Sequence, residues 1–355
     1  KPEMTICPTA AAASAIAAGA ALAQPAFHEL GPGFTPFSAS ADGSVVAGQS
    51  DALGQIFVWT TDAGSVGIGG TIPSTGGAGQ PTLSGDGTRL VGTVIDPATG
   101  LHTISIYDRA SGTWTPLGGI GGESDGSTSS GWSFSADGST AVGLGWVNAG
   151  TAHAIRWTAA EGIVDLGSTV PGRSSRANDV SADGRVIAGW QDRSDGFRQA
   201  AVWHDGAQTV ISTLAGDPLG EAGAVSADGR WVVGSGGFAT SDQAWRWSSD
   251  GGVELLGTLA GVSGRGAATG ISGDGSVIVG YVRGFGPPTL GEGFIWTEET
   301  GMMHLDAYFA SFGIVAPDGF HFSLPLGVSD DGLTFWGLGR SDSVFSTGWV
   351  VTIPA

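Results

Sequence analysis

Residues 40–48 read Ser-Ala-Asp-Gly-Ser-Val-Val-Ala-Gly, and this stretch decides the fold of the chain. It contains Ser-x-Asp-Gly followed by four residues and a second glycine. The same pattern occurs seven times, and the copies begin at Ser40, Ser84, Ser135, Ser181, Ser226, Ser272 and Ser329. Successive aspartates of the pattern are 44, 51, 46, 45, 46 and 57 residues apart. This spacing is typical of a four-stranded β-propeller blade rather than of a helical repeat.

Each copy of the pattern predicts a tight hairpin turn. Serine suits the first position of a type I turn, and glycine suits the left-handed position that ends a hairpin with a G1 bulge. The aspartate carboxylate can accept hydrogen bonds from the backbone N–H groups of its own turn, so its recurrence has a local structural cause. A metal site would need several carboxylates at one point, whereas one aspartate per blade indicates seven separate turns.

The residues after each turn predict a strand that is buried on both faces. Apolar pairs such as Val46-Ala47 and Ile278-Val279 follow the aspartate by four and five residues. Consecutive apolar residues indicate that each sheet is sandwiched between two others. The glycine six residues past each aspartate, Gly48 in the first copy, is interpreted as a bulge or a point of close backbone approach.

Two more strands recur in the repeat. One ends in an aromatic residue, at Trp59, Tyr107, Trp157, Trp203, Trp247, Trp296 and Trp349, and this regular place predicts packing between blades. The other ends in Leu-Gly, as in Gly162 to Gly167, and is missing after the last repeat, whereas Phe27 to Gly31 matches it ahead of the first. We therefore predict an all-β, seven-bladed β-propeller with four-stranded blades, whose ring is closed by the N-terminal strand.

The N-terminal residues differ from the repeat. Residues 1–23 are interpreted as a secretory signal peptide, because an alanine-rich apolar run ends in the small-x-small pattern Ala21-Leu22-Ala23. Residues 24–355 are expected to form a single propeller domain. The one cysteine, Cys7, lies in the leader, so the expected mature chain has no cysteine, which agrees with export. Past the leader, no stretch approaches the roughly 18 apolar residues of a membrane span.

The excess of acidic over basic residues limits the classes of molecule that the chain is expected to bind. Acidic residues exceed basic ones by 33 to 14, and the basic residues form no run, so nucleic acid is excluded as an expected partner. Hydrolase, phosphate-loop and zinc motifs such as Gly-x-Ser-x-Gly, His-Glu-x-x-His and Cys-x-x-Cys are absent. The six histidines fall in different repeats. No cofactor and no metal site is therefore predicted.

Catalytic groups, if the chain has any, are expected where the repeat is interrupted. The two long intervals are residues 118–131 and 306–325, and their chemically active side chains are Glu123, Asp125, Tyr308, Asp318 and His321. A polysaccharide lyase or glycosidase could use Tyr308 or His321 as a base, or paired carboxylates. The alternative is that the first interval is a Gly/Ser loop and the second a small helical cover with a short helix through Phe312.

Two non-periodic tryptophans are candidates for ligand binding. Trp146 and Trp190 follow the second glycine of their repeats, near a strand end where an exposed ring could stack on a sugar. The alternative for both is packing in the core or at the rim.

The repeat resembles that of the bacterial extracellular HAF-repeat proteins. The resemblance rests on Ser-x-Asp-Gly-x4-Gly, on strands such as His153 to Trp157 and Gly162 to Gly167, and covers residues 27–352. It implies an exported scaffold, often with a sorting tail of Pro-Glu-Pro type, and residues 352–355 end where such a tail would begin. It implies no catalytic residue.

We therefore expect a secreted or surface-displayed, non-catalytic scaffold that binds extracellular polysaccharide or a surface protein. The alternatives are a propeller-type polysaccharide lyase or glycoside hydrolase and a platform for protein–protein interaction.

Overall fold

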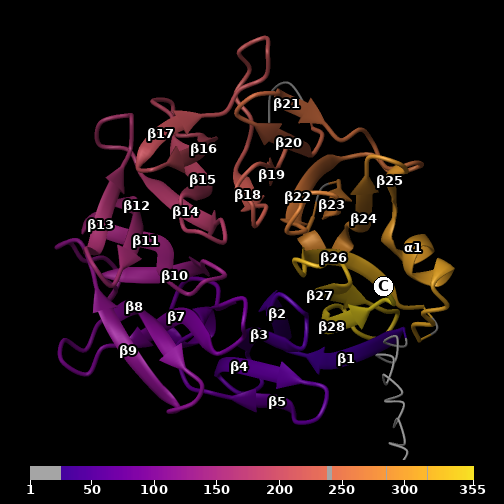
Figure 1. Cartoon of the computed structure of the whole chain (residues 1–355), viewed down its shortest axis with the longest axis horizontal. Helices are drawn as coiled ribbons and strands as arrows, with labels where there is room; N and C mark the ends of the chain where they lie inside the picture. Colours follow the sequence, from indigo (N-terminus) through magenta and orange to yellow (C-terminus); the bar gives the residue numbers. More distant parts are fainter. Residues whose placement is uncertain (1–24, 238–241, 285, 318) are drawn as a thin grey trace, which may run out of the picture.

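The computed structural model describes residues 25–237, 242–284, 286–317 and 319–355. Seven four-stranded antiparallel sheets stand around a central axis like the blades of a propeller (Figure 1). This confirms the predicted fold class. The predicted signal peptide, residues 1–23, and Asp318 lie outside the described residues.

Each of the first four blades runs from the inner strand to the outer strand in chain order. Their strands are β2 (Phe34–Ala39), β3 (Val45–Ser50), β4 (Gln55–Thr60) and β5 (Gly64–Gly67) in blade 1; β6 (Thr82–Leu83), β7 (Arg89–Ile95), β8 (His102–Asp108) and β9 (Thr113–Gly118) in blade 2; β10 (Ser129–Phe134), β11 (Thr140–Asn148), β12 (Thr151–Thr158) and β13 (Gly162–Gly167) in blade 3; and β14 (Ser175–Val180), β15 (Val186–Asp192), β16 (Arg198–His204) and β17 (Ala207–Val210) in blade 4.

The other three blades follow the same plan. Among the described residues, one short 3₁₀ helix connects blades 1 and 2, another lies within blade 6, and one α-helix connects blades 6 and 7. The elements are β18 (Ala222–Val225), β19 (Val232–Gly234), β20 (Trp245–Ser248) and β21 (Gly252–Leu255) in blade 5; β22 (Arg265–Ile271), β23 (Ile278–Arg283), β24 (Glu292–Thr297) and β25 (Gly301–His304) in blade 6; β26 (His321–Val328), β27 (Thr334–Arg340), β28 (Thr347–Thr352) and β1 (Ala26–Pro32) in blade 7; and η1 (Pro73–Thr75), η2 (Pro288–Leu290) and α1 (Leu305–Ser311).

Blade 7 closes the ring with strands from both ends of the chain. β1 pairs antiparallel with β28, and Phe27 lies opposite Val351. The Phe27 ring also packs edge-on against Phe320 and Phe322, with ring centroids 5.2 and 5.6 Å apart. The predicted closure by the N-terminal strand is confirmed, and it gives the last blade its outer strand.

The seven Ser-x-Asp-Gly segments form the predicted turns between the first and second strands of the blades. In every turn the serine hydroxyl donates to the aspartate carboxylate at 2.5–2.8 Å. The backbone N–H two residues after the aspartate donates to the same carboxylate at 2.8–3.1 Å. The turn glycines have φ between 66° and 78°, where a side chain would be strained. Each aspartate therefore stabilises its own turn.

The second glycine of the repeat is needed because the inner strand comes very close. A Cβ added at Gly48 would lie 2.2 Å from the carbonyl oxygen of Thr35, and one at Gly189 would lie 2.0 Å from that of Arg176. The inner strand has a register shift at this level, as between Pro36 and Ser38. The close backbone approach predicted for this glycine is confirmed, and the bulge lies on the inner strand opposite it rather than at the glycine itself.

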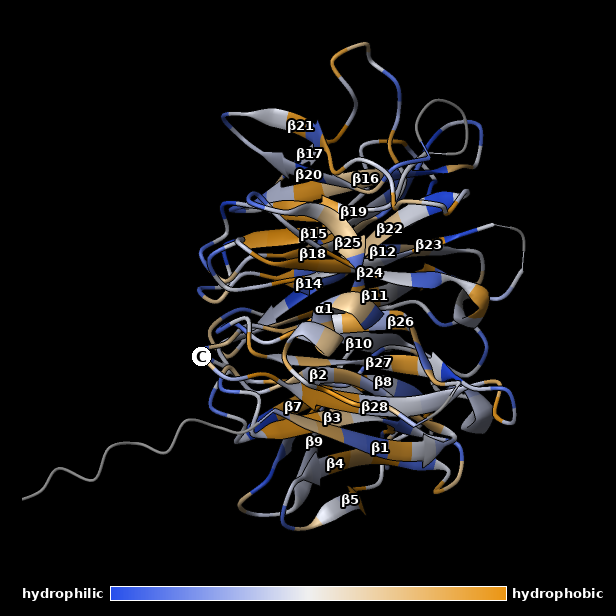
Figure 2. Cartoon of the chain, turned by 90° about the vertical axis from the view of Figure 1, so that its right-hand side faces the viewer, coloured by the Kyte–Doolittle hydropathy of each residue, from blue (hydrophilic) through white to orange (hydrophobic). Residues whose placement is uncertain are grey.

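Apolar side chains fill the space between neighbouring blades. In one cluster Ala47 and Val58 of blade 1 pack with Leu90 and Tyr107 of blade 2. Figure 2 shows the hydrophobic residues concentrated along the strands, while hydrophilic residues lie mostly in the connections. Most of the periodic aromatic residues are buried, as predicted for packing between blades, with Trp203 and Trp349 fully enclosed. The core is thus a ring of interfaces, one at each junction.

Candidate functional site

The two ends of the ring differ in the connections they carry. Because the strands of a blade alternate in direction, the Ser-x-Asp-Gly turns and the third-to-fourth strand turns share one end, which we call the turn face. The second-to-third strand hairpins and the connections between blades share the other end, which we call the loop face. Every long interruption of the repeat therefore lies on the loop face.

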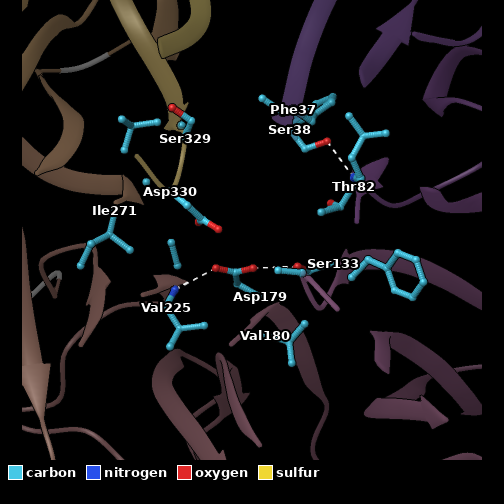
Figure 3. Close-up of a pocket in the computed structure, with 18 of the residues that line it drawn as sticks. Phe37, Ser38, Thr82, Ser133, Asp179, Val180, Val225, Ile271, Ser329 and Asp330 are labelled. Atoms are coloured by element: carbon cyan, nitrogen blue, oxygen red, sulfur yellow. Dashed lines mark hydrogen bonds between the residues drawn. The ribbon is translucent and has the colours of Figure 1, made fainter. Parts of the chain in front are cut away.

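A cavity of about 170 Å³ lies on the central axis near the turn face (Figure 3). Its wall includes the x residues of six turns, all but Gly273. Six of the seven turns also donate a backbone hydrogen bond to the x-residue carbonyl of the next turn. Neighbouring turns lie so close together that the x position needs a small residue. A Cβ added at Gly85, for example, would lie 3.0 Å from the Cβ of Ala136. In the last repeat the x residue is Asp330, the only large one of the seven.

Asp179, near the end of β14, points into the same cavity. One of its carboxylate oxygens accepts a hydrogen bond from the Ser133 hydroxyl at 2.7 Å, and the other accepts one from the Val225 backbone N–H at 2.8 Å (Figure 3). The side chain therefore links blades 3, 4 and 5. Burial raises the pKa of Asp179 to about 6, and the negative charge of Asp330 adds to the effect.

Asp330 extends from the turn-face rim of the cavity toward its middle (Figure 3). Partial burial raises its pKa, and the neighbouring carboxylate of Asp331 contributes in the same direction. The cavity thus contains two carboxyl groups that titrate above their usual range. Pockets that bind small molecules usually exceed about 300 Å³, so this cavity suits water molecules better than a sugar.

A cluster of arginine and tryptophan side chains lies at the loop-face end of blades 3–5. It consists of Trp132, Arg176, Trp190, Arg198 and Glu221, which we call the arginine–tryptophan cluster. The Arg176 guanidinium lies 3.6 Å from the ring centroid of Trp132 and 5.3 Å from that of Trp190. Arg198 lies 4.1 Å from the Trp190 ring centroid. Trp132 also lines the axial cavity, so the cluster adjoins the channel.

Glu221 forms ion pairs with both arginines of the cluster. Its carboxylate lies 3.3 Å from Nη2 of Arg176 and also contacts Nη1 of Arg198. Asp192, which lies opposite Arg198 in the sheet, interacts electrostatically with Arg198 and Arg173. Three guanidinium groups, those of Arg173, Arg176 and Arg198, therefore face two carboxylates, those of Glu221 and Asp192, which leaves a local excess of one positive charge. Burial lowers the pKa of Arg176 to about 10, and the nearby charge of Arg198 contributes to the lowering, but the group stays cationic at neutral pH. This region contrasts with a chain whose net charge is −19.

The two candidate tryptophans have different surroundings. Trp190 is buried, and its indole N–H has no hydrogen-bond partner, so it supports the arginines rather than presenting a ring to solvent. Trp146, near the end of β11, remains partly exposed on the loop face. Sequence reasoning missed Trp132, Arg176 and Arg198, since they come from two blades and form no local motif.

The two candidate catalytic residues lie in different environments. The Tyr308 ring on α1 packs against Phe312 at 5.1 Å and Phe335 at 6.1 Å, and burial raises the pKa of its hydroxyl. His321 begins β26 with an exposed side chain, and its Nδ1 lies 3.4 Å from Asp306 Oδ2. A third residue, Glu292, completes a group whose possible ligand atoms all lie within 4.8 Å of one another. The short helix predicted through Phe312 is present, and it ends one residue earlier, at Ser311, with Phe312 as its C-cap.

The other interruption carries its two acids on the surface. Glu123 and Asp125 are both exposed, and the backbone of Asp125 is left-handed, with φ of 52°. A short bridge between Ser124 and Ser127 orders the middle of this segment.

The loop face also exposes large apolar side chains. They lie in or beside the hairpin between the second and third strands of six blades, at Leu53, Ile95, Val147, Phe197, Leu290 and Phe345. Their exposed fractions range from 39% to 59%, far above those of core residues. We call this set the apolar rim. Contiguous apolar patches mark surfaces that contact a partner, whereas single exposed apolar side chains are common on protein surfaces.

Three solved structures of similar architecture are distant from this chain in sequence. The propeller domain of the trilobed protease from Pyrococcus furiosus matches with a TM-score of 0.56 and 12% identity, over 93% of this chain and 94% of that one. An oligogalacturonate lyase from Vibrio parahaemolyticus matches with a TM-score of 0.56 and 11% identity, over 94% and 98%. TolB from Acinetobacter baumannii matches with a TM-score of 0.47 and 14% identity, over 74% of this chain and 60% of that one.

The similarities to the protease propeller domain and to the lyase support the β-propeller fold and no more. No protein-family model matches the sequence, and no curated protein matches it. Among the described residues, no helix combines the length and hydropathy that crossing a membrane would require.

Proposed function

We propose that this protein is a secreted or surface-displayed, non-catalytic propeller scaffold, and that its loop face binds an extracellular glycan with carboxylate groups. The observation that carries the proposal is the arginine–tryptophan cluster. In it, two guanidinium groups are stacked on indole rings and share a single carboxylate. Asp192 also lies near Arg198, and Arg173 near Asp192, so a further carboxylate, brought by a ligand, would complete the charge balance.

The chemistry of the cluster favours this ligand class. A guanidinium group offers several N–H donors in one plane, and it binds a carboxylate through two parallel hydrogen bonds. The Arg198 side chain is 47% exposed and therefore accessible from solvent. The stacked rings hold the guanidinium planes in place before the ligand arrives, so less side-chain entropy is lost on binding.

The rest of the loop face suits an extended ligand. Trp146 is partly exposed on this face, and the faces of sugar rings that carry C–H groups pack well on indoles. The apolar rim adds further contact points around the channel. An oligomeric glycan could reach several of these positions at once, which raises its overall affinity.

The surroundings of Tyr308 do not favour the alternative of a lyase or glycosidase. A tyrosine base needs its hydroxyl near a substrate and at a pKa close to the working pH. The Tyr308 ring instead packs among phenylalanines, and burial raises its pKa. A platform for protein partners is the second candidate, and the apolar rim is the observation that favours it.

Export is part of the proposal. Its support is the alanine-rich N-terminal run with its small-x-small ending and the absence of cysteine after Cys7. The resemblance to extracellular HAF-repeat proteins agrees with it.

Binding can be tested by calorimetric titration of the full chain with oligogalacturonate, a carboxylated glycan, and with a neutral cello-oligosaccharide of equal length. We expect saturable binding of the carboxylated oligomer only. Arg198→Gln should weaken it at least about tenfold, since one charge-assisted pair is lost. The matched control is Arg185→Gln, which removes an exposed arginine paired with Asp205 on the turn face.

Equal weakening in both variants, or no binding by the wild type, would contradict the proposal. Release of reducing ends or of unsaturated products, abolished by His321→Ala or Tyr308→Phe, would establish an enzyme instead of a scaffold. Binding of the neutral oligomer with the same affinity would exclude recognition through carboxylates.

A further inference from the structure

Three segments distant in sequence bring metal-ligating side chains together on the loop face. Glu292 is the first residue of β24, Asp306 is the second residue of α1, and His321 is the first residue of β26. One possible ligand atom from each lies within 4.8 Å of the other two. The group thus lies at the junction of blades 6 and 7, where the inserted helix interrupts the repeat.

Each carboxylate of the group is already oriented by a hydrogen bond from outside it. The backbone N–H of Phe322 donates to Oδ1 of Asp306 at 3.0 Å. Nη2 of Arg340 donates to Oε1 of Glu292 at 2.9 Å. Metal-binding carboxylates are commonly held in this way, with one oxygen engaged by the surrounding protein and the other left to bind the ion.

The spacing between the histidine and the aspartate fits two ligands of one ion. Nδ1 of His321 lies 3.4 Å from Oδ2 of Asp306, which is longer than a charge-assisted hydrogen bond of about 2.8 Å. Two ligand atoms that each lie about 2.1 Å from an ion at a tetrahedral angle are about 3.4 Å apart. A carboxylate oxygen of Glu292 lies within 4.8 Å of the ligand atoms of His321 and Asp306, so this side chain can supply the third ligand.

The local charge also favours a cation. Two carboxylates and one guanidinium, that of Arg340, give the group a net charge of about −1 when the imidazole is neutral. The side chains of His321 and Asp306 are 48% and 41% exposed, so an ion can enter directly from solvent. One imidazole with two carboxylates is a donor set that suits Zn²⁺ or Mn²⁺ better than Ca²⁺ or Mg²⁺.

We propose that Glu292, Asp306 and His321 form a binding site for a divalent transition-metal cation. Three protein ligands leave at least one coordination position open for water or for an oxygen of a bound molecule. The site is independent of the proposed glycan binding, because it shares no residue with the arginine–tryptophan cluster. The ion would fasten α1 to the start of β26 and so stabilise the junction of blades 6 and 7.

The test is a calorimetric titration of the chelator-treated full chain with ZnCl₂. We expect one ion per chain, with affinity weakened at least about tenfold in His321→Ala and in Asp306→Asn. Asp306→Asn keeps an oxygen that can accept the Phe322 N–H, so its fold should be retained. The matched control is His204→Ala, which removes an exposed histidine 3.5 Å from Asp205 on the turn face. MgCl₂ serves as the hard-cation control.

Circular dichroism spectra of the metal-free variants establish that each is folded before titration. Stoichiometric Zn²⁺ binding that survives in His204→Ala and is lost in the other two variants supports the site. Absence of saturable binding in the wild type overturns it. So does binding that is unchanged in His321→Ala and Asp306→Asn, or weakened equally in His204→Ala.

Discussion

Asp179→Asn should remove the part of the unfolding free energy that depends on the protonation of Asp179, and so make the protein less sensitive to pH. The side chain bridges three blades inside the axial cavity, with hydrogen bonds from Ser133 and Val225. Asparagine can keep both contacts, because its carbonyl oxygen accepts the Val225 N–H and its amide group donates to the Ser133 hydroxyl. The substitution therefore removes the titrating proton and the charge with little change in shape.

The magnitude follows from the shift in pKa. In the folded chain the pKa of Asp179 is about 6, against 3.8 for the ordinary group. The folded state thus binds the proton more tightly than the unfolded state, and its stability falls as the pH rises from about 4 through about 6. The total loss is about 3 kcal/mol, of which about 2 kcal/mol falls between pH 4.5 and pH 7.5.

Urea denaturation of both proteins at several pH values between 4.5 and 7.5 measures this loss. We expect the free energy of unfolding of Asp179→Asn, relative to the wild type, to increase by about 2 kcal/mol over this range. Asp330 titrates in both proteins, so its own contribution is largely common to them. The control is Asp42→Asn, because the pKa of Asp42 is lowered by its turn hydrogen bonds and its titration falls below the range. A difference that does not change with pH would refute the reasoning.

Three further substitutions test the architecture, each by urea denaturation. Gly48→Ala should cost about 3 kcal/mol, because its Cβ would lie 2.2 Å from the Thr35 carbonyl oxygen; a cost below about 0.5 kcal/mol would contradict the close approach. Phe27→Ala should cost about 2 kcal/mol, because the ring packs on Phe322 at the closure of the ring; a neutral result would mean that closure by β1 contributes little. Asp86→Ala should cost about 1 kcal/mol at neutral pH. The hydrogen bonds of that turn lower the Asp86 pKa to about 2, so the stabilisation is present above about pH 4 and should fade as the pH drops toward 2; a cost independent of pH would exclude a role for the ionised carboxylate.

Most of the architecture could be predicted because its causes are local and repeated. The turn around Asp42 needs only its own serine, glycine and backbone, and the same reasoning applies to all seven copies. A glycine at position 48 in the repeat indicates that another backbone segment comes too close for a side chain, and the structure places the Thr35 carbonyl there. The missing outer strand after Trp349, together with the unmatched Phe27 to Gly31, was sufficient to predict how the ring closes.

The candidate sites could be predicted only in part. Interruption of the repeat singled out the segment that contains His321, but not Glu292, whose strand belongs to a regular repeat. The place of Trp190 in the repeat, near a strand end, suggested a ring exposed for stacking on a sugar. The structure instead buries this ring beneath Arg176 and Arg198. Nothing in the sequence near Arg176 indicates that Trp132, in the preceding blade, lies against it.

The sequence by itself therefore determined the blade, the number of blades and the way they close, because turn geometry and strand burial depend on residues within about ten positions of one another. Only the tertiary structure decided which side chains share a site. Residues such as Glu292, Asp306 and His321 meet because the ring places the ends of separate strands and a helix side by side on the loop face. Distances of that kind depend on how blades pack against each other, and no local pattern in the chain records them.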